Sequence, residues 1–153
     1  MASYNSWNGE KLHGSGYLLT DVLKNELGFE GFIVSDWKGV DQLDGDYREA
    51  IKKAINAGID MVMVPDQYIV FIGHLLSLVE DGEVSVERID DAVSRILKQK
   101  FLLNLFDEPY TDGSLATSFG SEEHRQVARK AVRESMVILN EKNDVLPLQK
   151  KEQ

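Results

Sequence analysis

One carboxylate and one aromatic ring stand side by side at the end of a short apolar run. The run from Phe32 to Val34 is typical of a buried strand, and Asp36 and Trp37 follow it after a single serine. In parallel α/β folds, sites are built at the carboxyl ends of the strands. Pyranose rings pack on aromatic faces and are cleaved by carboxylates. Asp36 is therefore either a catalytic carboxylate of a sugar site or a solvated aspartate that caps the next turn.

A second aspartate, Asp66, follows the next apolar run, Ile59 to Val64, after one proline. Neighbouring strands lie about 4.8 Å apart, so Asp36 and Asp66 are expected over one pocket. Two carboxylates about 5–5.5 Å apart fit a retaining glycosidase, and a wider spacing fits an inverting one. The alternative is that Asp66 is only a turn residue.

Three further aspartates, Asp41, Asp44 and Asp46, raise the hypothesis of a calcium site. They lack the D-x-D-x-D-G order of an EF-hand loop and its terminal glutamate. A solvated acidic loop is the alternative. We expect no metal and no cofactor.

The three histidines, His13, His74 and His124, are scattered, and none has the i, i+4 spacing of a helical zinc pair. His74 lies in a helical pattern and is expected to be structural or exposed, whereas His13 lies in a loop from which it could line the pocket. Gly14-Ser15-Gly16 lacks the spacing and the preceding long strand of a nucleotide-binding loop.

Composition excludes several classes of function. The chain has 153 residues, a net charge of −9 and no cysteine. An acidic chain argues against nucleic-acid and anionic-membrane partners, which need a basic surface. Without cysteine there is neither a disulfide nor thiolate catalysis. No apolar run approaches the ~20 residues of a membrane helix, and the first residues lack the features of a signal peptide, so localisation stays open.

The expected elements alternate between helices and strands, which indicates parallel strands joined by crossover helices. Helices are expected at 17–27, 47–57 and 67–80, from Ser85 onward and from Ser121 onward; strands at 31–34 and 59–64; loops at 5–16 and 38–46; a linker at 105–120. The last helix is expected to turn Val127, Ala128, Ala131 and Val132 inward. A closed eightfold barrel needs ~200 residues or more, so the fold class is α/β, part of a larger (β/α)₈ barrel.

Four stretches, SYNSWNG, LLTDVLKNELGFEGFIVSDW, AGIDMVMVP and RIDDAVSRILKQKF, occur in this order. With them the chain resembles glycoside hydrolase family 3, in particular the β-glucosidases and exo-β-glucan hydrolases. The resemblance implies that Asp36 is the catalytic nucleophile of a retaining mechanism. It further implies that Trp37 shapes the subsite for the terminal sugar, that Tyr4 lies beside the nucleophile, and that Met63 belongs to the pocket wall.

The resemblance also implies a domain organisation. Residues 1–104 would be the last two to three βα units of the barrel, residues 105–120 a linker, and residues 121–153 the start of an α/β sandwich domain. The general acid/base would lie outside this chain, so we expect the isolated chain to be nearly inactive on β-glucosides or β-glucans. The full-length enzyme would be periplasmic or secreted. The alternative is a non-catalytic half-barrel fragment that only associates with a partner fragment, itself or a glycan.

Overall fold

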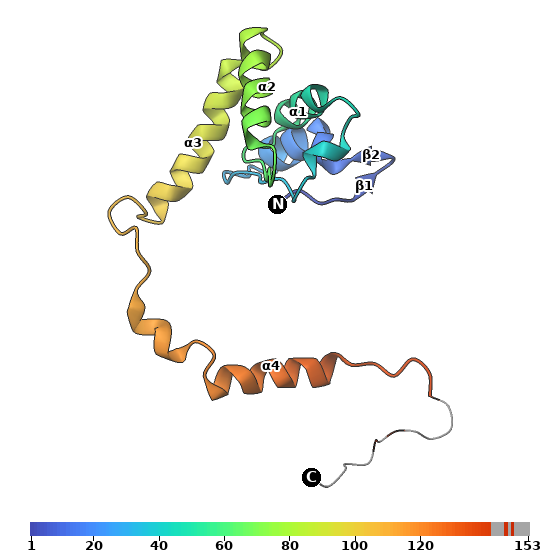
Figure 1. The fold of residues 1–153 in the computed structure, drawn as a ribbon, viewed down its shortest axis with the longest axis vertical. Helices are drawn as coiled ribbons and strands as arrows, with labels where there is room; N and C mark the ends of the chain where they lie inside the picture. Colours follow the sequence, from blue (N-terminus) through green and yellow to red (C-terminus); the bar gives the residue numbers. More distant parts are fainter. Residues whose placement is uncertain (142–145, 147, 149–153) are drawn as a thin grey trace. The chain divides into compact units, whose positions relative to one another are not determined.

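A computed structural model describes residues 1–141, 146 and 148 of the chain, which divides into two compact units at Pro109 and Tyr110. The ribbon of both units is drawn in Figure 1. The first unit, residues 1–109, contains a small hairpin and most of the helices. The second begins at Tyr110. The boundary between them falls inside the segment expected to be a linker, and the domain roles assigned above stay predictions.

The expected loop at 5–16 contains a hairpin, which corrects that prediction. Strand β1 (Ser6–Trp7) pairs antiparallel with β2 (Glu10–Lys11), and a short 3₁₀ helix, η1 (Leu12–Gly14), follows. The two connecting residues, Asn8 and Gly9, have φ of 50° and 86°. An Asn-Gly pair with left-handed backbone is the preferred two-residue hairpin turn, a signal that the loop assignment overlooked.

The first expected helix forms over η2 (Tyr17–Glu26), but it is wound as a π-helix rather than an α-helix. Its hydrogen bonds reach five residues back, as in the bond of 2.9 Å from the Leu27 N–H to the Val22 carbonyl. Gly28 follows with φ of 66°, the left-handed residue expected after the helix. The wider winding places the Lys24 side chain in the interior, where it meets an aspartate from another segment.

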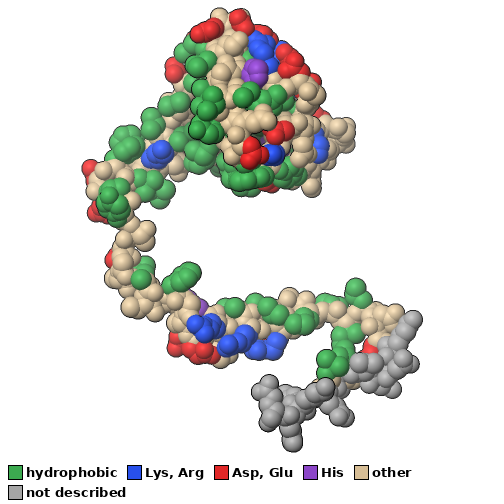
Figure 2. Space-filling view, viewed as in Figure 1, with side chains coloured by type: hydrophobic (Ala, Val, Ile, Leu, Met, Phe, Trp, Pro, Cys, Tyr) green, Lys and Arg blue, Asp and Glu red, His purple; other side chains and the backbone are tan. Residues whose placement is uncertain are grey.

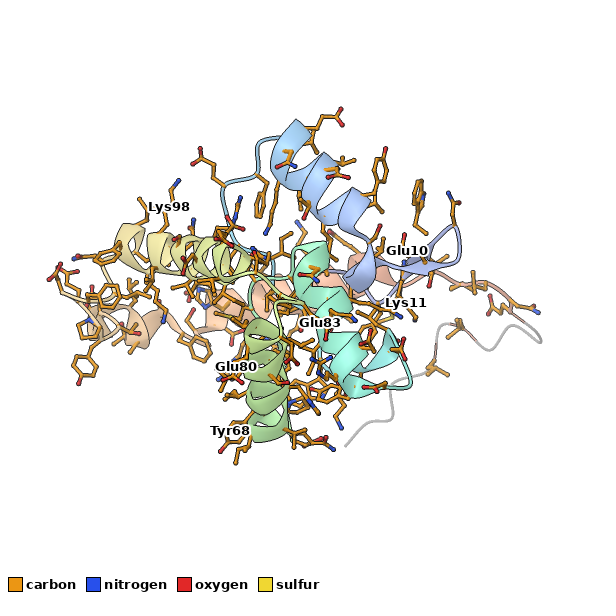
Figure 3. The ribbon with its side chains drawn as sticks, turned by 90° about the horizontal axis from the view of Figure 1, so that it is seen from above. Glu10, Lys11, Tyr68, Glu80, Glu83 and Lys98 are labelled. Carbon is orange, nitrogen blue, oxygen red and sulfur yellow. The ribbon has the colours of Figure 1, made fainter. Side chains whose placement is uncertain are left out.

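Three α-helices form where the apolar spacing predicted them: α1 (Tyr47–Ala57), α2 (Tyr68–Glu80) and α3 (Val86–Leu102). Asp46 caps α1 by accepting hydrogen bonds from two backbone N–H groups of its first turn, and Ser85 caps α3. Figure 3 shows Glu83, in the middle of the α2–α3 turn, beside α1, where it pairs with Arg48 and Lys52. These ion pairs join α1 to the α2–α3 turn.

The two expected strands, 31–34 and 59–64, are extended but form only one isolated bridge, between Val34 and Met61. The bridge is parallel, as the crossover through α1 requires. Side chains take two of the backbone donors that a longer ladder would use. The Ile33 N–H donates to the Asp60 carboxylate, and the Met63 N–H donates to the Ser35 hydroxyl. The described part of the chain is therefore mostly helical, with a partial parallel arrangement in place of the expected strands.

The core of the first unit lies between α1 and the two extended segments. One face of α1 is fully buried, and η2 and α2 pack around it. The buried apolar residues of the core are Ala2, Leu19, Ile33, Val40, Ala50, Ile51, Ala54, Ile55, Ala57, Ile59, Leu78 and Val84. Because residues from both extended segments are among them, the core fixes where these segments end.

A buried ion cluster stabilises the same unit, centred on the side chain of Asp60, which is 0% exposed. It accepts from Lys24 Nζ at 2.8 Å and from the Ile33 N–H at 2.7 Å, and it pairs with Arg88 of α3. Arg88 also donates to the carbonyls of Ile55 and Ile59. One carboxylate thus joins η2, α3 and both extended segments. Charged pairs of this kind depend on every partner being present.

The second unit contains a 3₁₀ segment, η4 (Gly113–Ser118), and helix α4 (Glu122–Ser135), capped by Ser121. The helix confirms the prediction, but the inward packing predicted for it is wrong. Val127, Ala128, Ala131 and Val132 are all exposed. The apolar stripe of α4 has no core to pack against among the described residues. Val145 and Pro147 of the expected domain entry lie outside those residues.

The helices that the structure describes are too short or too polar to cross a bilayer.

Candidate active site

Ser35 fixes the two extended segments to each other at the point where the first one ends. Its N–H donates to the Met61 carbonyl at 2.9 Å, and its hydroxyl accepts from the Met63 N–H at 2.8 Å. The hydroxyl also donates to the Asp36 carbonyl at 3.0 Å, and the residue is fully buried. These hydrogen bonds therefore fix the position of the Asp36 backbone at the edge formed by both segments.

The backbone of Asp36 is held from two further directions. Its N–H donates to Nε2 of His13 at 2.9 Å, and its carbonyl accepts from the Gly39 N–H at 3.0 Å. The carboxylate is half-buried, and Oδ1 accepts from the Trp37 N–H at 2.6 Å. The turn then passes through Lys38 in the left-handed region, with φ of 54°. The carboxylate thus lies in a short, hydrogen-bonded turn at a segment end.

Tyr4 lies close enough to Asp36 for the carboxylate to affect its ionisation. Desolvation is the largest cause that raises the pKa of the Tyr4 phenol, and the charges of Asp36 and Asp41 raise it further. The Tyr4 ring also lies 6.0 Å from the His13 ring, centroid to centroid. A phenol held in its neutral form beside a carboxylate can donate a hydrogen bond to it or to a ligand bound there.

Trp37 belongs to this turn, and Met63 of the second extended segment pairs with its flanking residues through the backbone. Met63 is half-buried, and its backbone pairs with Ser35 and with Lys38, whose N–H lies 3.4 Å from the Met63 carbonyl. Trp37 is 59% exposed, so its ring offers an open apolar face next to Asp36. The structure brings Tyr4, Asp36 and Met63 to one edge and leaves the Trp37 ring free to contact a ligand.

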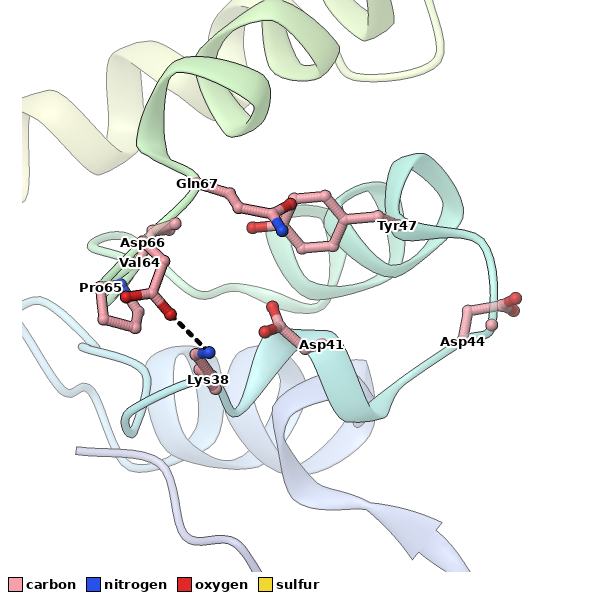
Figure 4. A pocket seen from close by; sticks show the side chains of 9 residues that line it. Lys38, Asp41, Asp44, Tyr47, Val64, Pro65, Asp66 and Gln67 are labelled. Carbon is pink, nitrogen blue, oxygen red and sulfur yellow. Dashed lines mark ion pairs between the residues drawn. The ribbon is translucent and has the colours of Figure 1, made fainter.

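Asp66 meets Lys38 rather than standing free beside Asp36. Lys38 Nζ lies 2.5 Å from Asp66 Oδ2, and the Asp66 hydrogen bond is the first cause that raises the pKa of Lys38. This pair lines a pocket of about 240 Å³, together with Asp41, Tyr47 and Gln67 (Figure 4). Asp36 is not among the described residues that line the pocket. The ion pair favours the turn-residue interpretation of Asp66 over that of a second catalytic carboxylate.

The acidic residues after the turn have structural partners. Asp46 caps α1, and Asp44 accepts from the Asp46 N–H at 3.0 Å and pairs with Lys53. The hydrogen bond from Lys53 is the first cause that lowers the pKa of Asp44. No three carboxylates or imidazoles of the described residues converge as a metal site would require. Asp44 and Asp46 therefore serve the start of α1, whereas Asp41 lines the pocket beside Lys38.

Two residues beside the site were not singled out by sequence reasoning in the roles that the structure gives them. Ser35 was treated only as a spacer before Asp36, and His13 only as a residue that could line a pocket. Their signals are weak, because a buried serine and a buried histidine differ from exposed ones only through partners distant in sequence. His74 is half-buried, and its ring lies edge-on to the Tyr47 ring with the two centroids 6.1 Å apart, which agrees with a structural role.

The fold and the site together define a mostly helical scaffold with two extended segments, which presents one carboxylate and one exposed indole at a segment end. Comparison with known proteins then gives the family. The model of the glycosyl hydrolase family 3 N-terminal domain matches residues 1–99. The chain belongs to glycosyl hydrolase family 3.

Relatives with curated names are similar over nearly the whole chain. The lysosomal beta glucosidase of Dictyostelium discoideum is 39% identical over 149 residues, which cover 92% of this chain and 18% of that protein. The periplasmic beta-glucosidase of Salmonella typhimurium is 34% identical over 161 residues, 98% of this chain and 21% of that protein. The chain therefore spans about a fifth of the length of these relatives.

Solved structures give the same result. The exo-1,3/1,4-beta-glucanase of a Pseudoalteromonas species is 41% identical with a TM-score of 0.78, covering 96% of this chain and 19% of that one. The beta-glucosidase of Listeria innocua is 32% identical with a TM-score of 0.76, covering 95% of this chain and 21% of that one. At these identities the likeness extends to sequence as well as to fold.

Proposed function

We propose that this chain supplies the nucleophile of a retaining glycoside hydrolase that releases terminal β-D-glucosyl residues from β-glucosides or β-glucans. The observation that carries the proposal is the turn at Asp36. Its backbone is fixed by His13, Ser35 and Gly39, and Oδ1 is held by the Trp37 N–H. Oδ2 receives no hydrogen bond from the residues that the structure describes, so it is the oxygen available for attack.

The reaction would have two steps. Oδ2 of Asp36 attacks the anomeric carbon, the bond to the aglycone oxygen breaks, and that oxygen leaves with the electron pair and takes a proton from a general acid. Water then attacks the anomeric carbon of the glycosyl ester, gives its proton to the same group, and frees Asp36. We place this acid/base in the part of the enzyme outside the chain, so the isolated chain turns over little or no substrate.

The neighbours of Asp36 would bind the sugar. The exposed Trp37 ring offers its face to the C–H groups of a pyranose. The neutral phenol of Tyr4 donates a hydrogen bond to the nucleophile or to a sugar hydroxyl, and the thioether of Met63 forms part of the apolar wall. These roles are the ones that the resemblance to family 3 implies, and the positions of the three residues near Asp36 support them.

A chimeric enzyme tests the nucleophile. Residues 1–104 of this chain replace the matching segment of the Pseudoalteromonas exo-glucanase, and hydrolysis of an aryl β-glucoside is measured. Asp36→Asn should lower kcat by roughly 10⁴-fold or more, the scale of losing a nucleophile. Asp66→Asn is the matched control at the same edge and should keep most of the rate. The reverse order of losses would show that Asp66 is the nucleophile.

Chemical rescue provides a second, independent readout. Azide added to the Asp36→Gly chimera should attack the anomeric carbon from the face that the carboxylate leaves empty and restore turnover of an activated aryl glucoside. The product should be the α-glucosyl azide, because the single displacement inverts the β-configuration. A β-azide would indicate that another nucleophile remains in the site.

Location in the periplasm or outside the cell is proposed for the full-length enzyme, since one relative is named a periplasmic beta-glucosidase.

A second candidate function is assembly without catalysis. The surface between α2 and α3 holds an apolar pocket of about 270 Å³, lined by Ile72, Leu75, Leu76, Val79, Glu80, Val86 and Ile89. Hydrophobic side chains gather along α3 in the space-filling view of Figure 2. Exposed apolar surface of this kind marks an interaction site. The occupant we propose is the remaining part of a family 3 enzyme, because the relatives extend far beyond the matched residues.

Size-exclusion chromatography tests the assembly candidate. If the apolar surface exists to be covered, the isolated chain should self-associate, and Leu76→Glu should shift it toward monomer. A monomer with a cooperative melt and no response to Leu76→Glu would argue against assembly through this surface.

A further inference from the structure

We propose that His13 is a positioning residue for Asp36: its neutral imidazole accepts the Asp36 N–H and so fixes the turn that presents the carboxylate. This inference deepens the proposed function and rests on it for its catalytic meaning. The hydrogen bond itself concerns the backbone and can be tested without substrate.

The geometry requires a deprotonated Nε2. That atom lies 2.9 Å from the Asp36 backbone nitrogen, and His13 is 1% exposed. A backbone N–H can only donate, so Nε2 must offer its lone pair, and the ring proton is assigned to Nδ1. In the imidazolium both ring nitrogens are donors. Protonation would therefore place two hydrogen-bond donors, Nε2–H and the Asp36 N–H, opposite each other, and the bond would be lost.

The imidazole is held in this place by its neighbours. The Tyr4 ring lies 6.0 Å away, tilted by 54°. A Cβ on Gly39 would lie only 2.4 Å from Nε2, closer than real atoms approach, so the turn can meet the ring only because residue 39 lacks a side chain. The His13 ring thus occupies the space that a side chain at position 39 would fill.

The charges that face the ring act in opposite directions. Burial is the largest cause and lowers the pKa of His13, and the charge of Lys11 lowers it further. The Asp36 carboxylate and a backbone hydrogen bond to Ser3 raise it. Burial outweighs the others, so the ring stays neutral at neutral pH and the acceptor is available.

A consequence for the enzyme follows from this arrangement. As pH falls through the pKa of His13, the Asp36 N–H loses its acceptor and the turn loosens. The acid limb of activity would then include a contribution from His13 in addition to the carboxylates. A histidine that does not touch the sugar would in this way adjust the nucleophile.

The test uses the full 153-residue chain, labelled with ¹⁵N, and two variants. His13→Gln keeps an acceptor of similar reach that does not titrate, whereas His13→Phe fills the space without one. The measured quantities are the Asp36 amide shift, followed from about pH 8 downward until the His13 ring has titrated, because burial lowers the pKa of that ring below the usual histidine value, and the hydrogen-exchange rate of the same amide. In the unaltered chain the amide shift should change with the same midpoint as the His13 ring.

His13→Gln should abolish that pH step while keeping slow exchange, and His13→Phe should speed exchange of the Asp36 amide by about tenfold or more, the scale of losing one hydrogen bond. If His13 acted through packing alone, His13→Gln would not keep the slow exchange of the Asp36 amide that His13→Phe loses. If the Asp36 amide shift does not change as the His13 ring titrates, the inference is overturned. This measurement is made on the unaltered chain, so it does not depend on whether a variant folds. Because no sugar is involved, an inactive chimera with a coupled titration would reject the proposed function alone, and an active chimera without coupling would reject only the role of His13.

Discussion

Helices α1 and α4 share an amphipathic pattern and a capped start, but they differ in whether the apolar face is buried. Both are amphipathic, and both begin at a side-chain cap, Asp46 for α1 and Ser121 for α4. The apolar face of α1 is buried, with Ile51 at 0% exposure, whereas Val132 on the corresponding face of α4 is 54% exposed. Figure 2 shows the apolar side chains of α4 along one edge of the helix. Local pattern therefore determines that a helix forms, but not what covers it.

Ion pairs differ between the two helices in the same way. Arg48 of α1 pairs with Asp81 at 2.6 Å and with Glu83 at 2.8 Å, both from the α2–α3 turn. The ion pairs that α4 makes among the described residues lie within the helix, such as Arg129 with Glu122 at 3.1 Å. Contacts between distant residues stabilise the first unit, and contacts between near neighbours stabilise α4. The predictions below are designed to test this difference.

The largest effect is expected from Asp60→Ala. Its removal orphans the Ile33 N–H and takes the buried carboxylate from Lys24, whose side chain is 4% exposed, and from Arg88, which keep only their pairs with the half-exposed Asp91 among the described residues. Breaking a buried pair in this way costs about 3–5 kcal/mol. Urea unfolding followed by circular dichroism should show the loss. The control is Asp66→Ala, whose pair with Lys38 is exposed to solvent and should contribute little to stability. Equal costs would mean that the buried cluster does not stabilise the first unit.

A pair of core and surface truncations compares the two helices directly. Ile51→Ala should cost about 2–5 kcal/mol, because it opens a cavity beneath α1. Val132→Ala on α4 should stay within about 0.5 kcal/mol, as is usual for exposed positions. Both are measured by urea unfolding at the same pH. A cost for Val132→Ala that approached the Ile51 value would show that α4 buries its apolar face in solution.

The sequence predicted the helices because their evidence is local. The spacing of Ile51 and its neighbours and the glycine at 58 lie within a few turns of each other, and the helix that they predict is confirmed. The cap at Asp46 was not predicted, because its carboxylate was grouped with Asp41 and Asp44 in a possible calcium site. The strand at 31–34 was predicted from its apolar run, but its hydrogen bonding depends on Asp60, a residue far along the chain. The π-winding of η2 and the role of His13 depend on similar long-range partners, so neither could be predicted from spacing.

A change of pH should affect the first unit through His13. Because burial lowers its pKa below the usual 6.5, the unfolded chain binds a proton before the folded chain does as pH falls. The free energy of unfolding should therefore be fully retained above about pH 6.5 and decline between that pH and the lowered pKa. Urea unfolding at about pH 7.5, 6 and 5 measures this decline. His13→Gln should remove the step in this window, and a step that persists in the variant would assign it to another group.

The smallest effect is expected from removing the cap of each helix. The comparison tests how much a cap contributes to a helix that packs on a core, α1, and to one whose apolar face is exposed, α4. Asp46 accepts from the Arg48 N–H at 2.8 Å, so Asp46→Ala should lower the unfolding free energy of the first unit by about 1 kcal/mol. Asp46→Asn keeps an acceptor and should cost only a few tenths, because asparagine caps about as well as aspartate. The loss appears in the unfolding free energy of the first unit, because α1 packs on the core and is expected to unfold together with it.

Ser121 accepts from the His124 N–H at 3.4 Å, at the start of a helix whose described apolar residues are exposed. Ser121→Ala should therefore reduce the helical signal of α4 gradually with temperature, without shifting a cooperative transition, since short isolated helices are marginal in water. Circular dichroism of the full chain and of the variant gives both quantities. A cooperative loss equal to that of Asp46→Ala would mean that α4 is stabilised by a core of its own, and the contrast in surroundings between the two helices would not hold in solution.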